Sequence, residues 1–201
     1  MIPESPVKAA TLILASGSSQ RHRLLTESGY RFNTVVPRDH AECGVCSRET
    51  PPELVARLSY QKAADVAEQL RTRPVAGDFI VGCDTVAECV GQILGKPADR
   101  KHARQMLELL SGREHHVYSG LCVWPLSGGR PTVKVARTKL RMDNLTEAQI
   151  EEYLASGLWE GKAGAFGYQD RIDWLHIVEG SESNVVGLPL ELLAEMLLSR
   201  D

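Results

Sequence analysis

A carboxylate and an ammonium lie close together in one predicted hairpin, and both suit chemistry on phosphates. Asp84 follows the apolar residues 79–81 and a glycine, and Lys96 follows the returning strand of the same hairpin. A carboxylate can hold a divalent cation or orient a water molecule, and an ammonium can neutralise charge on phosphoryl oxygens. Asp84 and Lys96 are therefore candidate catalytic residues. For the pair taken alone, a turn cap and a surface lysine are the alternative interpretation.

A serine-rich loop near the N-terminus is a candidate anion site. The short apolar run at residues 11–15 leads into the sequence SGSSQR at residues 16–21, and a helical segment follows. The backbone N–H groups of such a loop, the dipole of the helix and a guanidinium can all bind phosphate oxygens. The glycine spacing is neither that of a Walker loop nor that of a dinucleotide fingerprint. Ser16 and Arg21 are thus expected to bind phosphate, and the alternative is a serine that caps an ordinary helix.

Other residues have side chains that can ligate metals. Asp39 and Glu42 follow the predicted strand at residues 30–36, and carboxylates just past a strand end are common in α/β active sites. A solvated acidic loop is the equal alternative there. His115 and His116 are neighbours on a predicted strand, so their side chains face opposite sides and do not both bind one ion.

Two further segments supply polar candidates. Lys62 lies within the predicted helix at residues 51–70, where the helical pattern alone indicates a surface residue. Residues 160–170 are rich in glycine and too irregular for a regular element. Such a segment can close over a ligand, with Lys162 and Gln169 as its polar contacts.

The composition argues against some classes of protein. The 201 residues carry a formal net charge of −3 with a sequence pI near 6.1, which argues against a broad basic surface for duplex nucleic acid. We find no secretory signal, membrane-length apolar run, repeat or linker, so we expect one compact cytoplasmic unit. The five cysteines are an odd set without framework spacing, namely Cys43, Cys46, Cys83, Cys89 and Cys122. Cys43 and Cys46 have the spacing of a zinc or redox pair, but we favour chance spacing in a loop because no second pair exists.

The predicted elements indicate a mixed sheet. We expect strands at residues 11–15, 30–36, 79–90, 93–94, 115–124, 133–140 and 172–178. Helices are expected at residues 51–70, 99–110, 146–154 and 190–198, with a turn at residues 184–189. Asp99 is the predicted N-cap of one helix, and Thr146 with Gln149 forms a capping box in another. Strands that alternate with helices and also form hairpins favour a mixed α/β fold over a purely parallel one.

The motifs, in this order, resemble the Maf family of nucleotide pyrophosphatases. The matching segments are LASGS at residues 14–18 with Arg21, GCDT at 82–85, LGKP at 94–97, MLELLSG at 106–112 with His115 and Val117, KAGAFGYQ at 162–169 and NVVGLP at 184–189. The resemblance covers most of the chain and implies one domain over residues 1–201. It also implies an elongated, two-lobed fold like that of inosine triphosphate pyrophosphatases, with a central cleft, and homodimerisation.

The resemblance implies hydrolysis of a nucleoside triphosphate, normal or modified, between its α and β phosphates. The products are a monophosphate and pyrophosphate, the cofactor is Mg²⁺ or Mn²⁺, and the role is house-cleaning in nucleotide metabolism. By resemblance, the catalytic residues are Asp84, Glu42 and Lys96, the metal ligands are Asp84 and Glu42, and the substrate-binding residues are Ser16, Arg21, Lys62 and Gln169. Asp39 competes with Glu42 for its role, because an extra residue precedes Glu42.

Two positions depart from the pattern of the family. Gln20 stands where the family has a second arginine, and Ser119 stands where it has threonine. The sequence GYQ at residues 167–169 resembles the branch that acts on dTTP and UTP more than the branch that acts on 7-methyl-GTP. We therefore expect a pyrimidine substrate and keep the 7-methyl-GTP branch as an alternative.

Two other classes of protein compete with this interpretation. A nucleotide-binding regulator of cell division with little turnover would fit the loss of an arginine at Gln20. Retention of Asp84, Lys62 and Lys96 argues against it. A haloacid dehalogenase-type phosphatase would need a second aspartate two residues after Asp84, where Val86 stands.

Overall fold

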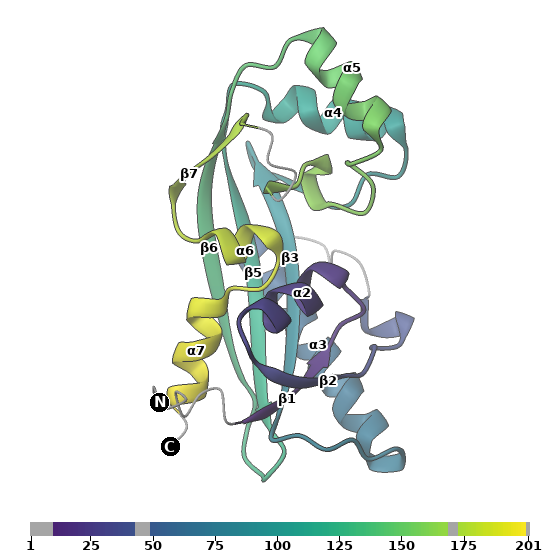
Figure 1. Cartoon of the computed structure of the whole chain (residues 1–201), viewed down its shortest axis with the longest axis vertical. Coiled ribbons are helices and arrows are strands. Elements are labelled where there is room, and N and C mark those ends of the chain that lie inside the picture. The colour runs from purple at the N-terminus through teal and green to yellow at the C-terminus, as the bar shows by residue number, and fades with distance from the viewer. Residues whose placement is uncertain (1–9, 43–48, 169–172, 200–201) are drawn as a thin grey trace.

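The structure is a computed structural model, and it describes residues 10–42, 49–168 and 173–199. Its centre is a seven-stranded sheet in the order β2-β1-β3-β5-β6-β7, with β4 also paired to β3 (Figure 1). The strands are β1 (Thr11–Ala15), β2 (Arg31–Thr34), β3 (Phe79–Cys89), β4 (Gln92–Leu94), β5 (Glu114–Pro125), β6 (Thr132–Met142) and β7 (Leu175–Glu179). The helices are α2 (Ser19–Glu27), α3 (Pro51–Thr72), α4 (Arg100–Leu110), α5 (Glu147–Ser156), α6 (Glu182–Val186) and α7 (Leu190–Leu198), with 3₁₀ turns η1 (Asp39–Glu42) and η2 (Ala163–Ala165).

The sheet is mixed, as expected from the sequence. β1 pairs in parallel with β2 and β3, whereas β3, β5, β6 and β7 pair antiparallel. The long strands β3, β5 and β6 run through an elongated molecule (Figure 1). One lobe adds β1, β2, α2 and α3 to them, and the other adds β4, α4, α5 and η2. The predicted two-lobed architecture is therefore confirmed.

In the first lobe, both faces of the sheet are buried. Leu12 and Leu14 pack with α7 residues on one face, and Ile13 and Ala15 pack with α3 residues on the other. A strand that is buried on both faces needs apolar side chains on both, which explains the nearly continuous apolar sequence TLILA of β1. None of the helices in the described parts of the chain has the length and apolar character of a membrane span.

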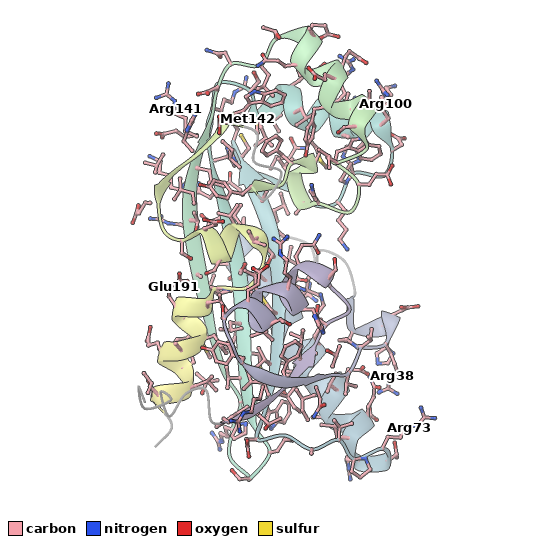
Figure 2. The ribbon with its side chains drawn as sticks, viewed as in Figure 1. Arg38, Arg73, Arg100, Arg141, Met142 and Glu191 are labelled. Carbon is pink, nitrogen blue, oxygen red and sulfur yellow. The ribbon has the colours of Figure 1, made fainter. Side chains whose placement is uncertain are left out.

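The second lobe has its own core beneath α4 and α5. The rings of Tyr153, Phe166 and Trp174 contact one another there, with centroids 5.0 to 6.1 Å apart. On the outside, Arg100 of α4 pairs with Glu151 of α5 at 2.5 Å (Figure 2). Exposed pairs of this kind contribute little, so the apolar core holds the two helices together.

One edge of β3 changes partner along its length, and this leaves a gap. β1 pairs with β3 as far as Gly82, and β4 begins to pair with it at Ala87. On its other edge β3 pairs with β5 without a break from Phe79 to Glu88. Within the described residues, neither β1 nor β4 covers residues 83–86 on the first edge. The sheet is thus open to side chains from elsewhere at this point.

Several local predictions are confirmed and others are corrected. Asp99 caps α4, and Thr146 with Gln149 forms the predicted capping box of α5. β2 ends at Thr34 instead of residue 36, and β7 begins at Leu175 instead of residue 172, which lies outside the described residues. The predicted turn at residues 184–189 is wrong in its first half. Helix α6 occupies Glu182–Val186 because Ser181 caps it, and the turn follows at Gly187.

Two glycines let α3 approach the sheet closely. A Cβ atom on Gly82 would overlap the backbone oxygen of Ser59, and one on Gly120 would overlap that of Val55. Both backbone oxygens belong to α3, so a side chain at either glycine would fit only if the helix moved away. These glycines therefore set the distance between α3 and the strands.

We expect Gly82→Ala to lower the free energy of unfolding by about 1–3 kcal/mol, because the added methyl forces α3 away from β3. Chemical denaturation of the variant and the wild type measures this. Gly95→Ala is the matched control, since a Cβ there meets no atom within 4 Å. Equal losses in the two variants would contradict the close-approach argument.

Candidate active site

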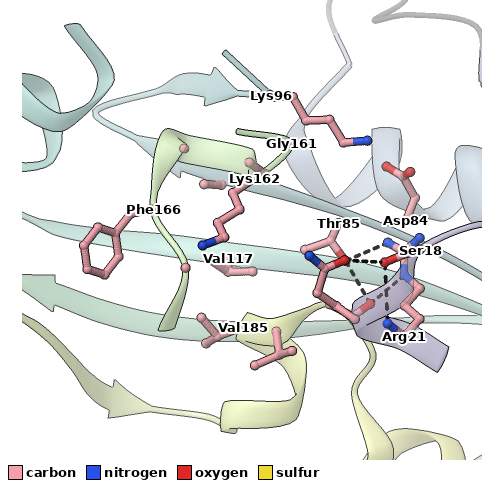
Figure 3. A pocket seen from close by; sticks show the side chains of 18 of the residues that line it. Ser18, Arg21, Asp84, Thr85, Lys96, Val117, Gly161, Lys162, Phe166 and Val185 are labelled. Carbon is pink, nitrogen blue, oxygen red and sulfur yellow. Dashed lines mark hydrogen bonds between the residues drawn. The ribbon is translucent and has the colours of Figure 1, made fainter. Parts of the chain in front are cut away.

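A cleft of about 880 Å³ lies at the open edge of β3 and is lined by both lobes. Its first end is polar, and it is lined by Ser16, Ser18, Ser19, Gln20, Arg21, Asp39, Lys62, Asp84, Thr85 and Lys96. Its second end is largely apolar, and it is lined by Leu110, His115, Val117, Leu140, Met142, Phe166, Leu175 and Val185. Figure 3 shows this division, with Asp84, Thr85 and Arg21 at one side and Phe166, Val117 and Val185 at the other.

A buried ion pair stands at the polar end. Lys62 Nζ lies 2.7 Å from Asp84 Oδ1, and the two side chains are 6% and 14% exposed. Lys62 comes from α3 and Asp84 from the uncovered stretch of β3. The helical pattern of the sequence, which indicated a surface lysine, is therefore wrong for Lys62. The ammonium is buried because Gly82 lets this face of α3 lie directly against the strand that carries its counter-ion.

Arg21 ties the serine loop to the rest of the site. Its guanidinium donates from Nη1 to Ser16 Oγ at 3.1 Å, from Nε to the Gly187 carbonyl at 2.8 Å and from Nη2 to Thr85 Oγ1 at 3.3 Å. Thr85 Oγ1 in turn lies 2.8 Å from Ser119 Oγ. The predicted neighbours Ser16 and Arg21 are thus brought together. Thr85 was missed as a site residue, although its place directly after Asp84 was a usable signal.

Gln20 turns its side chain toward its own loop. Its Oε1 accepts hydrogen bonds from Ser18 Oγ at 2.9 Å and from Ser19 Oγ at 3.3 Å. Ser18 also accepts from the backbone N–H of Arg21 and so caps α2. The N-terminus of α2 and two serine hydroxyls therefore lie at the polar end of the cleft, a favourable setting for an anion.

Two lysines enter the cleft from the second lobe. Lys96 follows β4, and its ammonium points toward the Asp84 carboxylate (Figure 3). Lys162 precedes η2 and also lines the cleft. A Cβ on Gly167 would come within 2.9 Å of Lys162 Nζ, so the missing side chain at Gly167 leaves room for the lysine. Together with Arg21 and Lys62, Lys96 makes the polar end suited to a multiply charged anion, whereas the ammonium of Lys162 lies on the side of Val117 and Phe166 (Figure 3).

Of the remaining predicted site residues, one lines the cleft and the others lie outside the described structure. Asp39, at the start of η1, lines the cleft, and η1 ends at Glu42. The side chain of Glu42 lies outside the described part of the structure, as do Gln169, Cys43 and Cys46. The roles of Glu42 and Gln169 therefore stay predictions.

His115 is a titratable group at the apolar end. It is 4% exposed, and among the described residues its Nδ1 has no hydrogen-bond partner. Burial lowers the pKa of His115 to about 4, and a hydrogen bond to the backbone of Arg113 opposes that shift in part. The ring is therefore neutral at neutral pH. His116 lies on the opposite side of the strand, 3.4 Å from Glu88, so the prediction that the two histidine side chains face opposite sides is confirmed.

The described residues fit only a lightly ligated divalent cation. Among them, no group of three His, Cys, Asp or Glu side chains could hold a metal ion. Mg²⁺ commonly uses one or two carboxylates, and the remaining positions go to water and substrate phosphates. The Asp84 carboxylate beside an anion-binding loop fits that mode, with the phosphates of a substrate as the other ligands.

Comparisons with known proteins identify relatives of the whole chain. The model of the Maf-like protein family matches residues 11–200. A dTTP/UTP pyrophosphatase of Rhodopirellula baltica is 54% identical over 188 residues, 93% of this chain and 81% of that protein. A dTTP/UTP pyrophosphatase of Geotalea uraniireducens is 40% identical over 182 residues, 90% of each chain. The structure of the Staphylococcus aureus Ham1 protein superposes with a TM-score of 0.50 at 10% identity, over 95% of this chain and all of that one, which shows a shared fold.

We expect Lys62→Met to lower the free energy of unfolding by about 3 kcal/mol, because it leaves the Asp84 carboxylate in a mostly buried place without its counter-ion. The double variant Lys62→Met/Asp84→Leu should recover much of this loss, since it removes the unpaired charge as well. Denaturation of the two variants gives both values. A double variant less stable than Lys62→Met would contradict this account of the pair.

We expect the depressed pKa of His115 to make stability fall as the medium becomes more acid. The folded state holds the ring neutral to about pH 4, while the unfolded state protonates near pH 6.5. The unfolded state therefore binds more protons between these values, and about 3 kcal/mol is lost as the pH falls through that window. Comparison of His115→Leu with the wild type at pH 7 and pH 4.5 isolates this contribution. An unchanged pH dependence in the variant would rule it out.

Proposed function

This chain belongs to the Maf-like protein family, and from that premise we propose that it hydrolyses dTTP and UTP to the nucleoside monophosphate and pyrophosphate. The observation that carries the proposal is the cleft itself, which holds the Lys62–Asp84 pair and the serine loop at one end and is largely apolar at the other. A nucleoside triphosphate has the matching division into a charged chain and a flat, largely apolar base. Two relatives are named dTTP/UTP pyrophosphatases, and these names support dTTP and UTP as the substrates of this chain in preference to 7-methyl-GTP.

The polar end accounts for binding of the triphosphate. We assign the phosphates to the loop of Ser16 to Arg21 and to the ammonium of Lys96. Arg21 already makes three hydrogen bonds within the protein, so its main contribution is to fix the loop and supply positive charge. The side chain of Gln169, which the family resemblance assigns to substrate binding, is proposed to contact the base or sugar.

Asp84 is proposed to act on the attacking water. The oxygen of water forms a bond to the α-phosphorus, the bond from that phosphorus to the bridging oxygen breaks, and pyrophosphate leaves. An oxygen of Asp84 orients the water and accepts its proton. Lys62 holds the carboxylate in place, and Lys96 offsets charge that develops on the phosphoryl oxygens.

The family resemblance implies a divalent cation, and we propose that Asp84 and Glu42 hold Mg²⁺ or Mn²⁺. When bound, such an ion lowers the charge of the triphosphate and makes water a better nucleophile. We further propose a reducing, cytoplasmic setting. The thiols of Cys83, Cys89 and Cys122 are buried and form no disulfide within the described structure, as in proteins that do not rely on disulfides.

We expect Asp84→Asn to lower the rate of pyrophosphate release from dTTP and UTP at least about 1,000-fold while nucleotide binding persists, because the amide cannot accept the proton. The assay measures pyrophosphate from dTTP, UTP, 5-methyl-UTP, CTP and 7-methyl-GTP with Mg²⁺ or Mn²⁺. Asp173→Asn, at an exposed aspartate, is the matched control and should keep wild-type activity.

Three outcomes would change the conclusion. Full turnover in Asp84→Asn would remove Asp84 from the mechanism. Turnover confined to 7-methyl-GTP would move the chain to the other branch of the family. Nucleotide binding without turnover in the wild type would favour the regulator, and Gln20→Arg would then test whether the missing arginine is the reason.

A further inference from the structure

Lys162 is a cation of the cleft to which the proposed chemistry assigns no task. It precedes η2 of the second lobe and lines the cleft. Its ammonium lies on the side of Val117 and Phe166, which belong to the apolar end (Figure 3). Lys96, by contrast, points toward the Asp84 carboxylate. An ammonium has three donors and no acceptor, so the position of Lys162 indicates that the ligand presents an acceptor at the apolar end.

The backbone next to Lys162 is held against the hairpin of β3 and β4. The backbone N–H of Gly164 donates to the Gly95 carbonyl at 3.0 Å. The φ angle of Gly164 is 72°, which glycine adopts without strain. A Cβ on Gly164 would lie 3.2 Å from Ala87 Cβ, so this turn lies directly on β3. The segment that carries Lys162 is therefore fixed to the strand that carries Asp84.

The side chain of Lys162 runs along Gly167, which also lines the cleft. A Cβ on Gly167 would lie 2.8 Å from Cδ, 2.9 Å from Cε and 2.9 Å from Nζ of Lys162. Three successive atoms of the lysine thus pass close to one glycine, and this contact gives the side chain its direction. A side chain at residue 167 would push the ammonium out of its place.

The position of the ammonium suits a nucleotide whose α-phosphate lies at Asp84. In the ladder of β3 and β5, Asp84 lies opposite Gly120, and Ala87 lies opposite Val117. Three residues along antiparallel strands span about 10 Å. The sugar separates the α-phosphate of a nucleotide from its base, so the base falls nearer the level of Val117 than that of Asp84. The ammonium of Lys162 is therefore at the level of the base.

The edges of the pyrimidines decide which acceptor an ammonium can select. Uracil and thymine have a carbonyl oxygen at C4, whereas cytosine has an amino group there. An ammonium can only donate, so it binds O4 of uracil or thymine and is opposed by the amino group of cytosine. All three bases have a carbonyl at C2, so a contact with O2 would not distinguish them.

We propose that Lys162 selects uracil and thymine over cytosine by donating a hydrogen bond from its ammonium to O4 of the base. This rests on the proposed function for the nucleotide and for the place of its α-phosphate. A site that hydrogen-bonds a polar group of the substrate discriminates more strongly than the shape of an apolar pocket does. The apolar side chains at this end of the cleft lower the local dielectric and so strengthen the hydrogen bond.

The test measures binding of non-hydrolysable α,β-imido analogues of dUTP and dCTP by isothermal titration calorimetry. Lys162→Met keeps the length of the side chain and removes its charge, so it should weaken binding of the dUTP analogue about tenfold and leave that of the dCTP analogue within about twofold. Lys96→Met makes the same exchange at the polar end and is the matched control. It should weaken both analogues by one factor and preserve the preference. Equal weakening of both analogues in Lys162→Met would make Lys162 a phosphate ligand and overturn the proposal.

Two further measurements test the contact itself. Gly167→Ala retains the lysine but displaces its ammonium, so it should reduce the same preference, and an unchanged preference would contradict the proposal. Sulfur is a weak acceptor, so a sulfur at C4 of the dUTP analogue should weaken its binding to the wild type but not to Lys162→Met. Equal losses from sulfur at C2 and at C4 would overturn the choice of O4. These measurements need no turnover, so an inactive wild type that still prefers the dUTP analogue would reject the proposed function and support this inference.

Discussion

The buried pair of Lys62 and Asp84 is the interaction on which the site depends. An ammonium and a carboxylate removed from water each lose hydration worth several kcal/mol, and only close mutual contact offsets that loss. The distance of 2.7 Å requires α3 to lie against β3, which Gly82 and Gly120 permit. The packing of α3 in the first lobe therefore determines the geometry of the site, because any shift of α3 would separate Lys62 from Asp84.

The second requirement is the break in pairing along one edge of β3. In a fully paired strand, neighbouring strands on both edges would keep other segments away from the carboxylate. The pairing of β1 with β3 ends at Gly82 and that of β4 with β3 begins at Ala87, so Asp84 and Thr85 lie where one edge of β3 is open. The serine loop follows directly from the end of β1, so the same break places the anion-binding turn and α2 beside Asp84.

The sequence predicted most elements because their signals are local. Apolar runs marked the buried strands, and Asp99 and Thr146 marked helix starts that the structure confirms. It also identified Ser16, Arg21, Asp84 and Lys96, which the cleft brings together. The failures arise from tertiary contacts. The sequence pattern of Lys62 is that of a surface residue because nothing local indicates a counter-ion 22 positions away.

The long strands of the sheet also constrain how the enzyme can move. Many two-lobed proteins admit and release ligands by rotation of whole lobes about flexible connectors. Here β3, β5 and β6 belong to both lobes, and β3 and β5 stay hydrogen-bonded to each other past the level of Asp84. A hinge at the cleft would have to break that ladder. Entry of the nucleotide and release of pyrophosphate must therefore depend on local rearrangement of the irregular segments around the cleft mouth. The long strands β3, β5 and β6 remain rigid throughout a catalytic cycle.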